Sequence, residues 1–266
     1  MTLSFFFLLG LIIGSFLNVV VLRLESGKTL GGRSQCPSCG KLIRWYDNVP
    51  ILSFFLLGRQ CRECHFPISW QYPAVELATG FLFALFGSQT LKTGMWSEMI
   101  TLAWLLILVS LLIVIALYDA RNMEIPLVLL LTGVGLMVAY ALCISALSPL
   151  AWWDVSIPWR DMFWGGSIAA IVFYALVYFS HETWMGMGDV WLAGVVGAAV
   201  GLSALLLLST LSFGTGALVG VGLLILRKRG MKSQVPFAPF LVIGTLTTLY
   251  LQALNPWWLT LFLLPV

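Results

Sequence analysis

The feature that most constrains this chain is a succession of apolar segments, each close to the length that a helix needs to cross a bilayer. About 20 apolar residues are needed to span a hydrocarbon core roughly 30 Å thick. With 60% hydrophobic and only 9% charged residues, the chain has too little polar surface for a soluble domain. We therefore predict an all-α integral membrane protein with about eight transmembrane helices. They are predicted near residues 2–22, 72–90, 99–118, 126–148, 163–181, 189–208, 210–226 and 237–256.

The sixth and seventh segments are separated only by a weak polar break around Ser209 to Phe213, so seven spans remain an alternative. The first segment is expected to stay as a span, because no basic residue precedes it and a basic stretch follows it, the reverse of a secretory signal. Basic residues in short loops favour the cytosol. Eight spans with both termini outside leave only Lys92 and Arg160 outside. The other twelve basic residues then face the cytosol, namely Arg23, Lys28, Arg33, Lys41, Arg44, Arg59, Arg62, Arg121, Arg227, Lys228, Arg229 and Lys232.

The polar stretch from residue 23 to 71 carries two CxxC motifs, which are separated by 21 residues. This spacing is close to that of a zinc ribbon, and two CxxC turns supply the four thiolates that tetrahedral Zn²⁺ favours. A four-sulfur site leaves no position for water, so the predicted metal is structural. Ordinary thiols or disulfides are the alternative, but disulfides rarely persist in the cytosol. The predicted ligands are Cys36, Cys39, Cys61 and Cys64, and the adjacent His65 is not needed.

Two aspartates stand out, because ionisable residues at membrane depth or at the mouth of a helix are functional candidates. Asp119 ends the third predicted span and Asp189 opens the sixth. In the predicted topology, both carboxyl groups reach the cytosolic face. Two close carboxyl groups share a proton, so one can activate a water while the other protonates a carbonyl oxygen, as in aspartic proteases. Gly186 and Gly188 would let the backbone beside Asp189 approach a substrate strand or a neighbouring helix.

A purely structural interpretation of these aspartates also exists. Asp189 at a helix N-terminus is favourable to the helix dipole and can cap the helix. Asp119 fits that interpretation less well, because the dipole disfavours an anion at a helix C-terminus. Glu124, Asp161 and Glu182 are interpreted as solvated loop charges. Gly194, Gly197 and Gly201 continue a small-residue pattern suited to close helix packing.

The chain resembles the bacterial type IV prepilin peptidases, which are bifunctional leader peptidases and N-methyltransferases. The resemblance runs nearly end to end and includes the paired CxxC motifs. The other motifs that carry it are Gly14-Ser15-Phe16-Leu17-Asn18, Asn48-Val49-Pro50-Ile51, Tyr72-Pro73-Ala74-Val75-Glu76, Asp119 followed by Ile125-Pro126, Gly186-Met187-Gly188-Asp189 and Pro236-Phe237-Ala238-Pro239-Phe240.

This resemblance implies that Asp119 and Asp189 are catalytic, that the four loop cysteines bind zinc, and that Glu76 and the preceding loop belong to the methylating activity. It implies a first transmembrane helix over residues 1–22, a cytosolic zinc-binding loop over 23–71 and a helical peptidase core over 72–266. The implied partners are the lipid bilayer of the bacterial inner membrane and a prepilin or pseudopilin with a positively charged leader. S-adenosylmethionine is the implied methyl donor, and no nucleic acid is expected.

The chain departs from the family pattern at three positions. Trp191 stands where lysine is usual, Glu25 where proline is usual, and Gln71 where arginine is common. Trp191 in place of lysine removes a cation near Asp189. This change is expected to alter the pKa of the carboxyl pair or a contact with the substrate. Two other functions remain open at this stage. The first is a proton-coupled or ion-coupled transporter that uses the intramembrane carboxylates, and the second is a membrane scaffold holding a zinc module.

Overall fold

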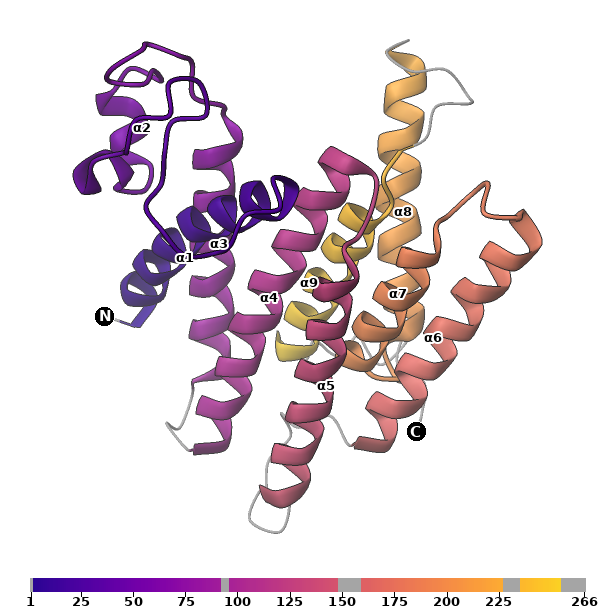
Figure 1. Ribbon diagram of the computed structural model, residues 1–266. Helices are drawn as coiled ribbons and strands as arrows, with labels where there is room; N and C mark the ends of the chain where they lie inside the picture. The colour runs from indigo at the N-terminus through magenta and orange to yellow at the C-terminus, as the bar shows by residue number, and fades with distance from the viewer. Residues whose placement is uncertain (1, 92–95, 148–158, 227–234, 255–266) are drawn as a thin grey trace. The chain divides into compact units, whose positions relative to one another are not determined.

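The computed structural model describes residues 2–91, 96–147, 159–226 and 235–254, and these are almost entirely helical (Figure 1). Where eight spans were predicted, this part of the chain contains eight helices of 14 or more residues. Lys92 and the basic residues from Arg227 to Lys232 lie outside the described residues. The long helices are α1 (Thr2–Glu25), α3 (Gln71–Thr90), α4 (Trp96–Asn122), α5 (Leu127–Leu147), α6 (Trp159–Ser180), α7 (Met187–Val200), α8 (Leu205–Ile225) and α9 (Ala238–Leu254).

The helical fold class is confirmed. Two short helical turns, η1 (Trp45–Asn48) and α2 (Leu52–Leu56), lie in the polar stretch between α1 and α3. Among the described residues only two isolated β-bridges occur, both in this stretch. Four helices in the described ranges, α1, α4, α6 and α8, are long and apolar enough to cross a membrane. Shorter apolar helical stretches are Leu127–Cys143 within α5, α7 and α9.

The chain divides into two compact units, here called unit 1 (Met1–Ser88) and unit 2 (Gln89–Val266). In unit 1, α1 lies directly against α3, and glycines on α1 permit this contact. A Cβ atom on Gly10 would lie 2.6 Å from the carbonyl oxygen of Thr79, and one on Gly14 would lie 2.8 Å from the Cα atom of Glu76. Any side chain at either position would therefore push the two backbones apart.

Asn18 is fully buried between the same two helices. Its Nδ2 atom donates to the carbonyl of Gly14 at 3.2 Å and to that of Tyr72 at 3.4 Å. Its Oδ1 atom accepts from Nε2 of Gln71, also at 3.4 Å. A buried amide is costly unless it is hydrogen-bonded, so this network explains the polar residue inside an apolar segment. It also gives Gln71, where the family commonly has arginine, a packing role.

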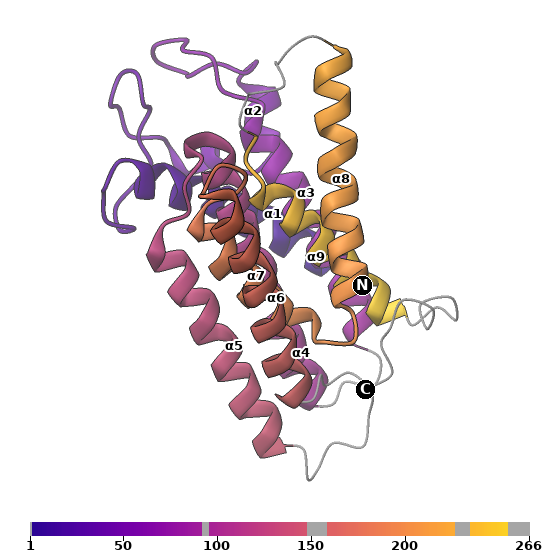
Figure 2. The same cartoon turned by 90° about the vertical axis from the view of Figure 1, so that its right-hand side faces the viewer.

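In unit 2, α7 contacts α5, α6, α8 and α9, and Figure 2 shows α5, α6 and α7 running side by side. The closest approach is between α6 and α7. A Cβ atom on Gly197 would lie 2.6 Å from the Cβ atom of Ala169 and 2.6 Å from the carbonyl oxygen of Gly165. The predicted small-residue packing is therefore confirmed at Gly197.

The predicted break between the sixth and seventh spans around Ser209 to Phe213 is wrong. The chain turns instead at Gly201, where φ is +79°, and α8 begins at Leu205. Ser209 and Thr210 are accommodated inside α8 because their hydroxyl groups donate to the carbonyls of Leu205 and Leu206, at 2.8 and 2.9 Å. Such bonds satisfy a hydroxyl within a helix, so these residues need not interrupt it.

The interpretation of Asp161 as a solvated loop charge is also wrong. Its side chain lies in the first turn of α6, is 8% exposed and fixes the turn between α7 and α8. The Oδ1 atom accepts from the N–H of Ser203 at 3.2 Å, and Oδ2 accepts from the hydroxyl of Ser203 at 3.4 Å. The main-chain carbonyl of Asp161 accepts from the N–H of Leu202 at 3.1 Å. Glu124 and Glu182 are exposed, as predicted.

We expect Asp161→Ala to destabilise unit 2 by about 1–2 kcal/mol, because it leaves the N–H and hydroxyl of Ser203 without their acceptor. Thermal unfolding of the purified protein in detergent would measure this as a lower midpoint. Glu124→Ala removes an exposed carboxylate from the same unit and is the matched control, with an expected change within about 0.5 kcal/mol. Equal midpoints for the two variants would contradict the role given to Asp161.

Candidate active site and metal centre

Asp119 lies in the last turns of α4 and is 6% exposed. Its Oδ2 atom accepts a hydrogen bond from the N–H of Ala238 at 3.2 Å, and Ala238 is the first residue of α9. The positive end of the α9 dipole therefore faces this carboxylate and offsets the unfavourable C-terminal end of α4. The sequence showed the unfavourable position of Asp119 but not the helix that compensates for it.

Asp189 is the third residue of α7 and is partly exposed. Its N–H donates to the carbonyl of Gly186 at 3.1 Å, and its Oδ2 atom accepts from the N–H of Gly186 at 3.3 Å. This reciprocal pair caps the start of α7. Asp189 therefore caps α7, as the structural interpretation predicts. The capping bonds do not use its Oδ1 atom.

The structure places Asp189 close enough to Asp119 to act on it electrostatically. The start of α7 packs against Ile125 in the connection between α4 and α5, because a Cβ atom on Gly188 would lie 3.4 Å from the Cβ atom of Ile125. Both α4 and α7 also contact α9. Three helix ends therefore surround the pair.

The two glycines beside Asp189 differ in their surroundings. Gly188 packs against Ile125 at ordinary van der Waals distance. Gly186 has an extended backbone, with φ −88° and ψ 162°, and a Cβ atom there would meet only the chain's own Gly188 nitrogen, at 4.0 Å. The predicted approach of a neighbouring element is therefore seen at Gly188, whereas the space beside Gly186 is open. Trp191, which replaces the usual lysine, is 52% exposed on α7.

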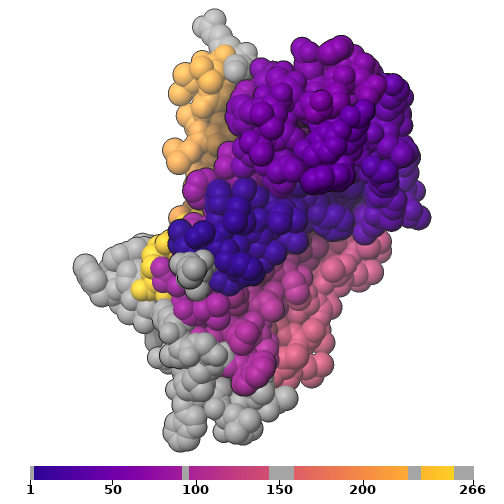
Figure 3. Space-filling view, turned by 90° about the vertical axis from the view of Figure 1, so that its left-hand side faces the viewer, coloured from indigo at the N-terminus to yellow at the C-terminus, as the bar shows by residue number. Residues whose placement is uncertain are grey.

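In unit 1, the four loop cysteines form one cluster. The Sγ atoms of Cys36, Cys39, Cys61 and Cys64 all lie within 4.8 Å of one another, and those of Cys36 and Cys64 are 3.7 Å apart. Tetrahedral zinc with Zn–S bonds of about 2.3 Å requires sulfur atoms about 3.8 Å apart. The cluster is therefore compatible with a structural zinc ion. Figure 3 shows the surrounding loop as a compact purple mass next to α1.

Each CxxC motif forms the same turn. The N–H of Gly40 donates to the carbonyl of Cys36 at 2.9 Å, and the N–H of His65 donates to that of Cys61 at 3.0 Å. Gly40 and His65 both have positive φ, +69° and +55°. His65 therefore occupies the turn position that glycine fills in the first motif. N–H donation from Cys64 and Glu63 lowers the pKa of the Cys61 thiol to about 7, whereas burial and the neighbouring thiols raise the pKa of Cys64 to about 11.

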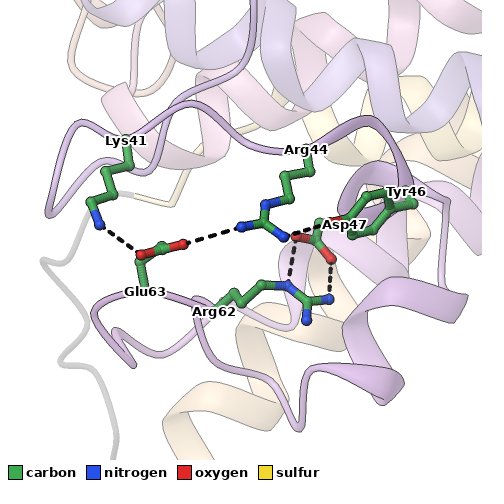
Figure 4. Close-up of polar contacts among 6 residues, drawn as sticks. All are labelled: Lys41, Arg44, Tyr46, Asp47, Arg62 and Glu63. Atoms are coloured by element: carbon green, nitrogen blue, oxygen red, sulfur yellow. Dashed lines mark hydrogen bonds and ion pairs between the residues drawn. The ribbon is translucent and has the colours of Figure 1, made fainter.

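Charged side chains link the two motifs across the loop (Figure 4). Glu63, from the second motif, lies between Lys41 at 2.6 Å and Arg44 at 3.8 Å. Arg62 donates to both oxygens of Asp47, at 2.6 and 3.0 Å. The bond from Lys41 holds the pKa of Glu63 below its usual range, and the bonds from Arg62 do the same for the pKa of Asp47. Each exposed ion pair contributes little to stability. We therefore infer that these pairs align the two motifs rather than stabilise the loop.

Glu76 lies on α3 and is 6% exposed. Its Oε2 atom accepts from the N–H of Ile51 at 2.7 Å, and the hydroxyl of Ser15 also bonds to the carboxyl group. Ile51 has φ +60°, an uncommon value for a branched residue. Glu76 thus holds a strained turn of the loop against α1 and α3. A cavity of about 260 Å³ in unit 1 is lined by Ser15, Arg23, Asn48 and Pro50, among others.

Sequence reasoning missed the contribution of Ala238, whose N–H binds Asp119. In the sequence, the segment around Ala238 was recognised only as one of the family motifs. A signal was present, because Pro239 follows Ala238 at the start of an apolar run, and proline in the first turn marks the start of a helix. A helix N-terminus facing the end of another helix is a site for an anion, but only the fold reveals which carboxylate it faces.

Comparison with known proteins agrees with these features. Residues 8–90 match the family model of the bacterial peptidase A24 N-terminal domain, and residues 106–221 match that of the type IV leader peptidase family. A prepilin leader peptidase/N-methyltransferase of Myxococcus xanthus is 34% identical over 98% of this chain and 76% of the relative. A type 4 prepilin-like proteins leader peptide-processing enzyme of Escherichia coli O78:H11 is 33% identical over 92% of each chain.

A prepilin leader peptidase/N-methyltransferase of Pseudomonas aeruginosa is 32% identical over 89% of this chain and 86% of the relative. No solved structure matches the chain significantly. Two family models that together cover most of the chain, and relatives that align over nearly its whole length, give the same answer. The chain belongs to the family of type IV prepilin leader peptidases.

Proposed function

We propose that this protein is an intramembrane aspartyl endopeptidase that removes the leader of prepilins or pseudopilins and then N-methylates the new N-terminus. The observation that carries the peptidase assignment is the meeting of Asp119 and Asp189 at the ends of two apolar helices. The known relatives carry the same two activities in their names. Nothing in the comparisons favours the transporter or the scaffold.

In the proposed mechanism the pair holds one proton between its two carboxyl groups. The carboxylate takes a proton from a water as that water attacks the scissile carbonyl, and the protonated partner donates to the developing oxyanion. The backbone N–H groups of Ala238 and Gly186 donate to Oδ2 of Asp119 and Asp189 respectively. Oδ1 of each is then the atom that acts on the water or the peptide. The bonds from Ala238 and Gly186 orient the two groups and stabilise whichever is ionised.

We place the protein in the bacterial inner membrane, with the zinc loop and the carboxyl pair on the cytosolic side. The distribution of basic residues supports this orientation, because the loop from Arg23 to Gln71 holds seven of the 14 lysine and arginine residues. A positively charged leader approaching from the cytosol would then be attracted to the negatively charged carboxyl pair. Opposite charges attract most strongly where water is partly excluded.

The test is direct. Purified protein in detergent is mixed with a short prepilin-like peptide, and the products are separated by mass. A peptidase yields two fragments whose masses add to that of the substrate plus one water. Intact peptide after prolonged incubation with folded protein would overturn the assignment and reopen the transporter alternative.

We propose that the loop cysteines hold one structural zinc ion. Wild-type protein is expected to carry about one zinc per chain, and Cys36→Ser to carry almost none, because structural zinc binding is coupled to local folding. Metal analysis and limited proteolysis of the loop would measure both effects, while the helices persist. Cys143→Ser, at an exposed cysteine outside the cluster, should keep the metal. Zinc-free wild-type protein, purified without chelators, would contradict this proposal.

We propose that methylation belongs to unit 1, with S-adenosylmethionine as donor. This cofactor supplies a methyl group on a sulfonium cation, and a buried carboxylate beside a cavity with both apolar and polar lining residues suits either that cation or the substrate amine. Glu76 is that carboxylate, and the cavity lined by Ser15 and Asn48 adjoins it. A separate family model covers this region, which supports a separate role.

Glu76→Gln is therefore expected to lower methylation of a pre-cleaved peptide at least about tenfold while leader cleavage continues. Glutamine keeps an oxygen that can accept from the N–H of Ile51, so the strained turn should survive. Ser15→Ala removes one hydrogen bond and keeps the carboxyl group, and should cost less. Methyl transfer from labelled S-adenosylmethionine is the measurement. Wild-type transfer by Glu76→Gln would remove Glu76 from the activity.

A further inference from the structure

Unit 2 contains a second feature that the proposed mechanism does not use, an apolar groove with a volume of about 250 Å³. Its walls come from α6 and α8 and its floor from α7, and Leu241 of α9 also lines it. The lining includes Val172 and Phe173 from α6, Ala193 and Val196 from α7, and Leu208 and Ser209 from α8.

The floor of the groove continues the face of α7 that carries Asp189. Ala193 and Val196 follow Asp189 by four and seven residues, a spacing that places all three on one helix face. At 1.5 Å per residue, the floor begins about 6 Å along the helix axis from Asp189. The groove therefore starts about one turn along α7 from Asp189 and extends away from it toward Leu205 and Leu206 at the start of α8.

Aromatic side chains join the groove to the other carboxyl group. The ring of Phe173 lies 5.9 Å from that of Phe213 and 6.0 Å from that of Phe237, measured between centroids. Phe237 immediately precedes Ala238, whose N–H binds Asp119. An apolar surface therefore runs from beside Asp119 into the groove.

The groove is open on the side where lipid would lie. Val172 on one wall is 50% exposed, and Ser209 on the other is partly exposed. Most of the apolar length of α8 is exposed, with only 11% of it buried. The α6 wall packs on α7 and the α8 wall packs on α9. A ligand can therefore enter between the two walls without separating either of these packed pairs.

We propose that the apolar residues on the carboxyl side of the scissile bond bind in this groove. The proposal rests on the proposed peptidase function and deepens it by naming a substrate subsite. A charged leader cannot enter a groove lined by apolar side chains at membrane depth, because burying its charge is too costly. The segment in the groove is therefore the one that remains after the leader is removed. Its apolar side chains bury surface against the groove, and this holds the scissile bond beside the two aspartates.

Disulfide cross-linking between neighbouring positions tests the proposal. Val172→Cys lines the groove, whereas Ile171→Cys is the adjacent residue, is 65% exposed and lies outside it. Both are made with Cys143→Ala, and with Asp189→Asn to retain uncleaved substrate. The four loop cysteines are present in both and give the same background. A substrate cysteine placed after the scissile bond should cross-link to Val172→Cys at least about tenfold more than to Ile171→Cys.

A kinetic arm uses another neighbouring pair. Ser209→Phe fills the groove and should raise the KM for a substrate with its apolar segment about tenfold. Thr210→Phe places the same ring on the exposed side of α8 and should leave KM unchanged. Equal cross-linking at 171 and 172, or an unchanged KM in Ser209→Phe, would mean that the groove holds lipid and would overturn the inference. Failure of wild-type protein to cleave the same substrate would instead overturn the proposed function, and the groove assignment with it.

Discussion

Asp189→Asn and Asp119→Asn are each expected to lower the rate of leader cleavage by at least about 10³-fold, and the double variant should be little worse than either. Each carboxyl group must exchange a proton at a different moment of the cycle, and asparagine is nearly isosteric but cannot do so. Residues that act as a unit lose most of their combined effect when either is removed. Cleavage of a prepilin-like peptide, followed by mass, is the measurement.

The variants should remain folded. Asparagine at 119 keeps an oxygen that can accept from the N–H of Ala238, and asparagine at 189 can still cap α7. The thermal midpoint of each variant is therefore expected to stay close to that of the wild type. Glu124→Gln neutralises an exposed carboxylate five residues after Asp119 and should cleave normally. Methylation of a pre-cleaved peptide should persist in both aspartate variants, because that activity is proposed for unit 1.

Two results would count against the dyad. Near wild-type cleavage by Asp189→Asn would leave Asp189 only its capping role at the start of α7. Losses that multiply in the double variant would mean that the two carboxyl groups act independently. In either case a shared proton would no longer explain why two helix ends bring these carboxylates together.

The helices were predictable because apolar length is a strong signal in a membrane protein. Backbone polar groups must be satisfied within the segment that crosses the bilayer, so a long apolar run predicts a helix with few alternatives. The cysteine cluster was predictable for a similar reason, since two CxxC turns at this spacing have one common use. Both signals are local, and both are confirmed by the structure.

The errors arise at polar residues whose role the local sequence leaves open. Asp161 has the sequence context of a charge at a helix start, and only the return of the chain at Gly201 makes it the acceptor for Ser203. Ser209 and Thr210 look like a break in an apolar run, but each satisfies its hydroxyl within α8. Glycine, serine and threonine are ambiguous inside membranes, because they serve turns and close packing equally well.

The candidate site shows the same division. Sequence reasoning selected both aspartates and placed each at a helix end, where the structure has them. It did not find the N–H of Ala238 that supports Asp119, because that contact joins residues 119 positions apart. It also did not find the groove, whose mostly apolar lining comes from four helices that lie far apart in the sequence.

The packing of α6 on α7 leads to the second large effect. Gly197→Leu is expected to destabilise unit 2 by more than about 3 kcal/mol, beyond the usual range for overpacked cores, and to abolish cleavage as well. A Cβ atom at this position would lie 2.6 Å from both the carbonyl oxygen of Gly165 and the Cβ atom of Ala169. Backbone atoms cannot rotate away as a flexible side chain can. The two helices must therefore separate, and α7 carries Asp189 with it.

Gly194→Ala is the matched control, three residues earlier on the same helix. A Cβ atom there would lie 3.5 Å from that of Ala170, an ordinary contact. Alanine is favoured over glycine inside a helix by about 1 kcal/mol, so this variant is expected to be as stable as the wild type or slightly more stable. In thermal unfolding in detergent, Gly197→Leu should unfold at a lower midpoint than the wild type and Gly194→Ala at the same or a slightly higher one. Peptide cleavage should be lost in Gly197→Leu. If Gly197→Leu unfolded at the wild-type midpoint, the close contact between α6 and α7 would be wrong, and so would the position of Asp189 that depends on it.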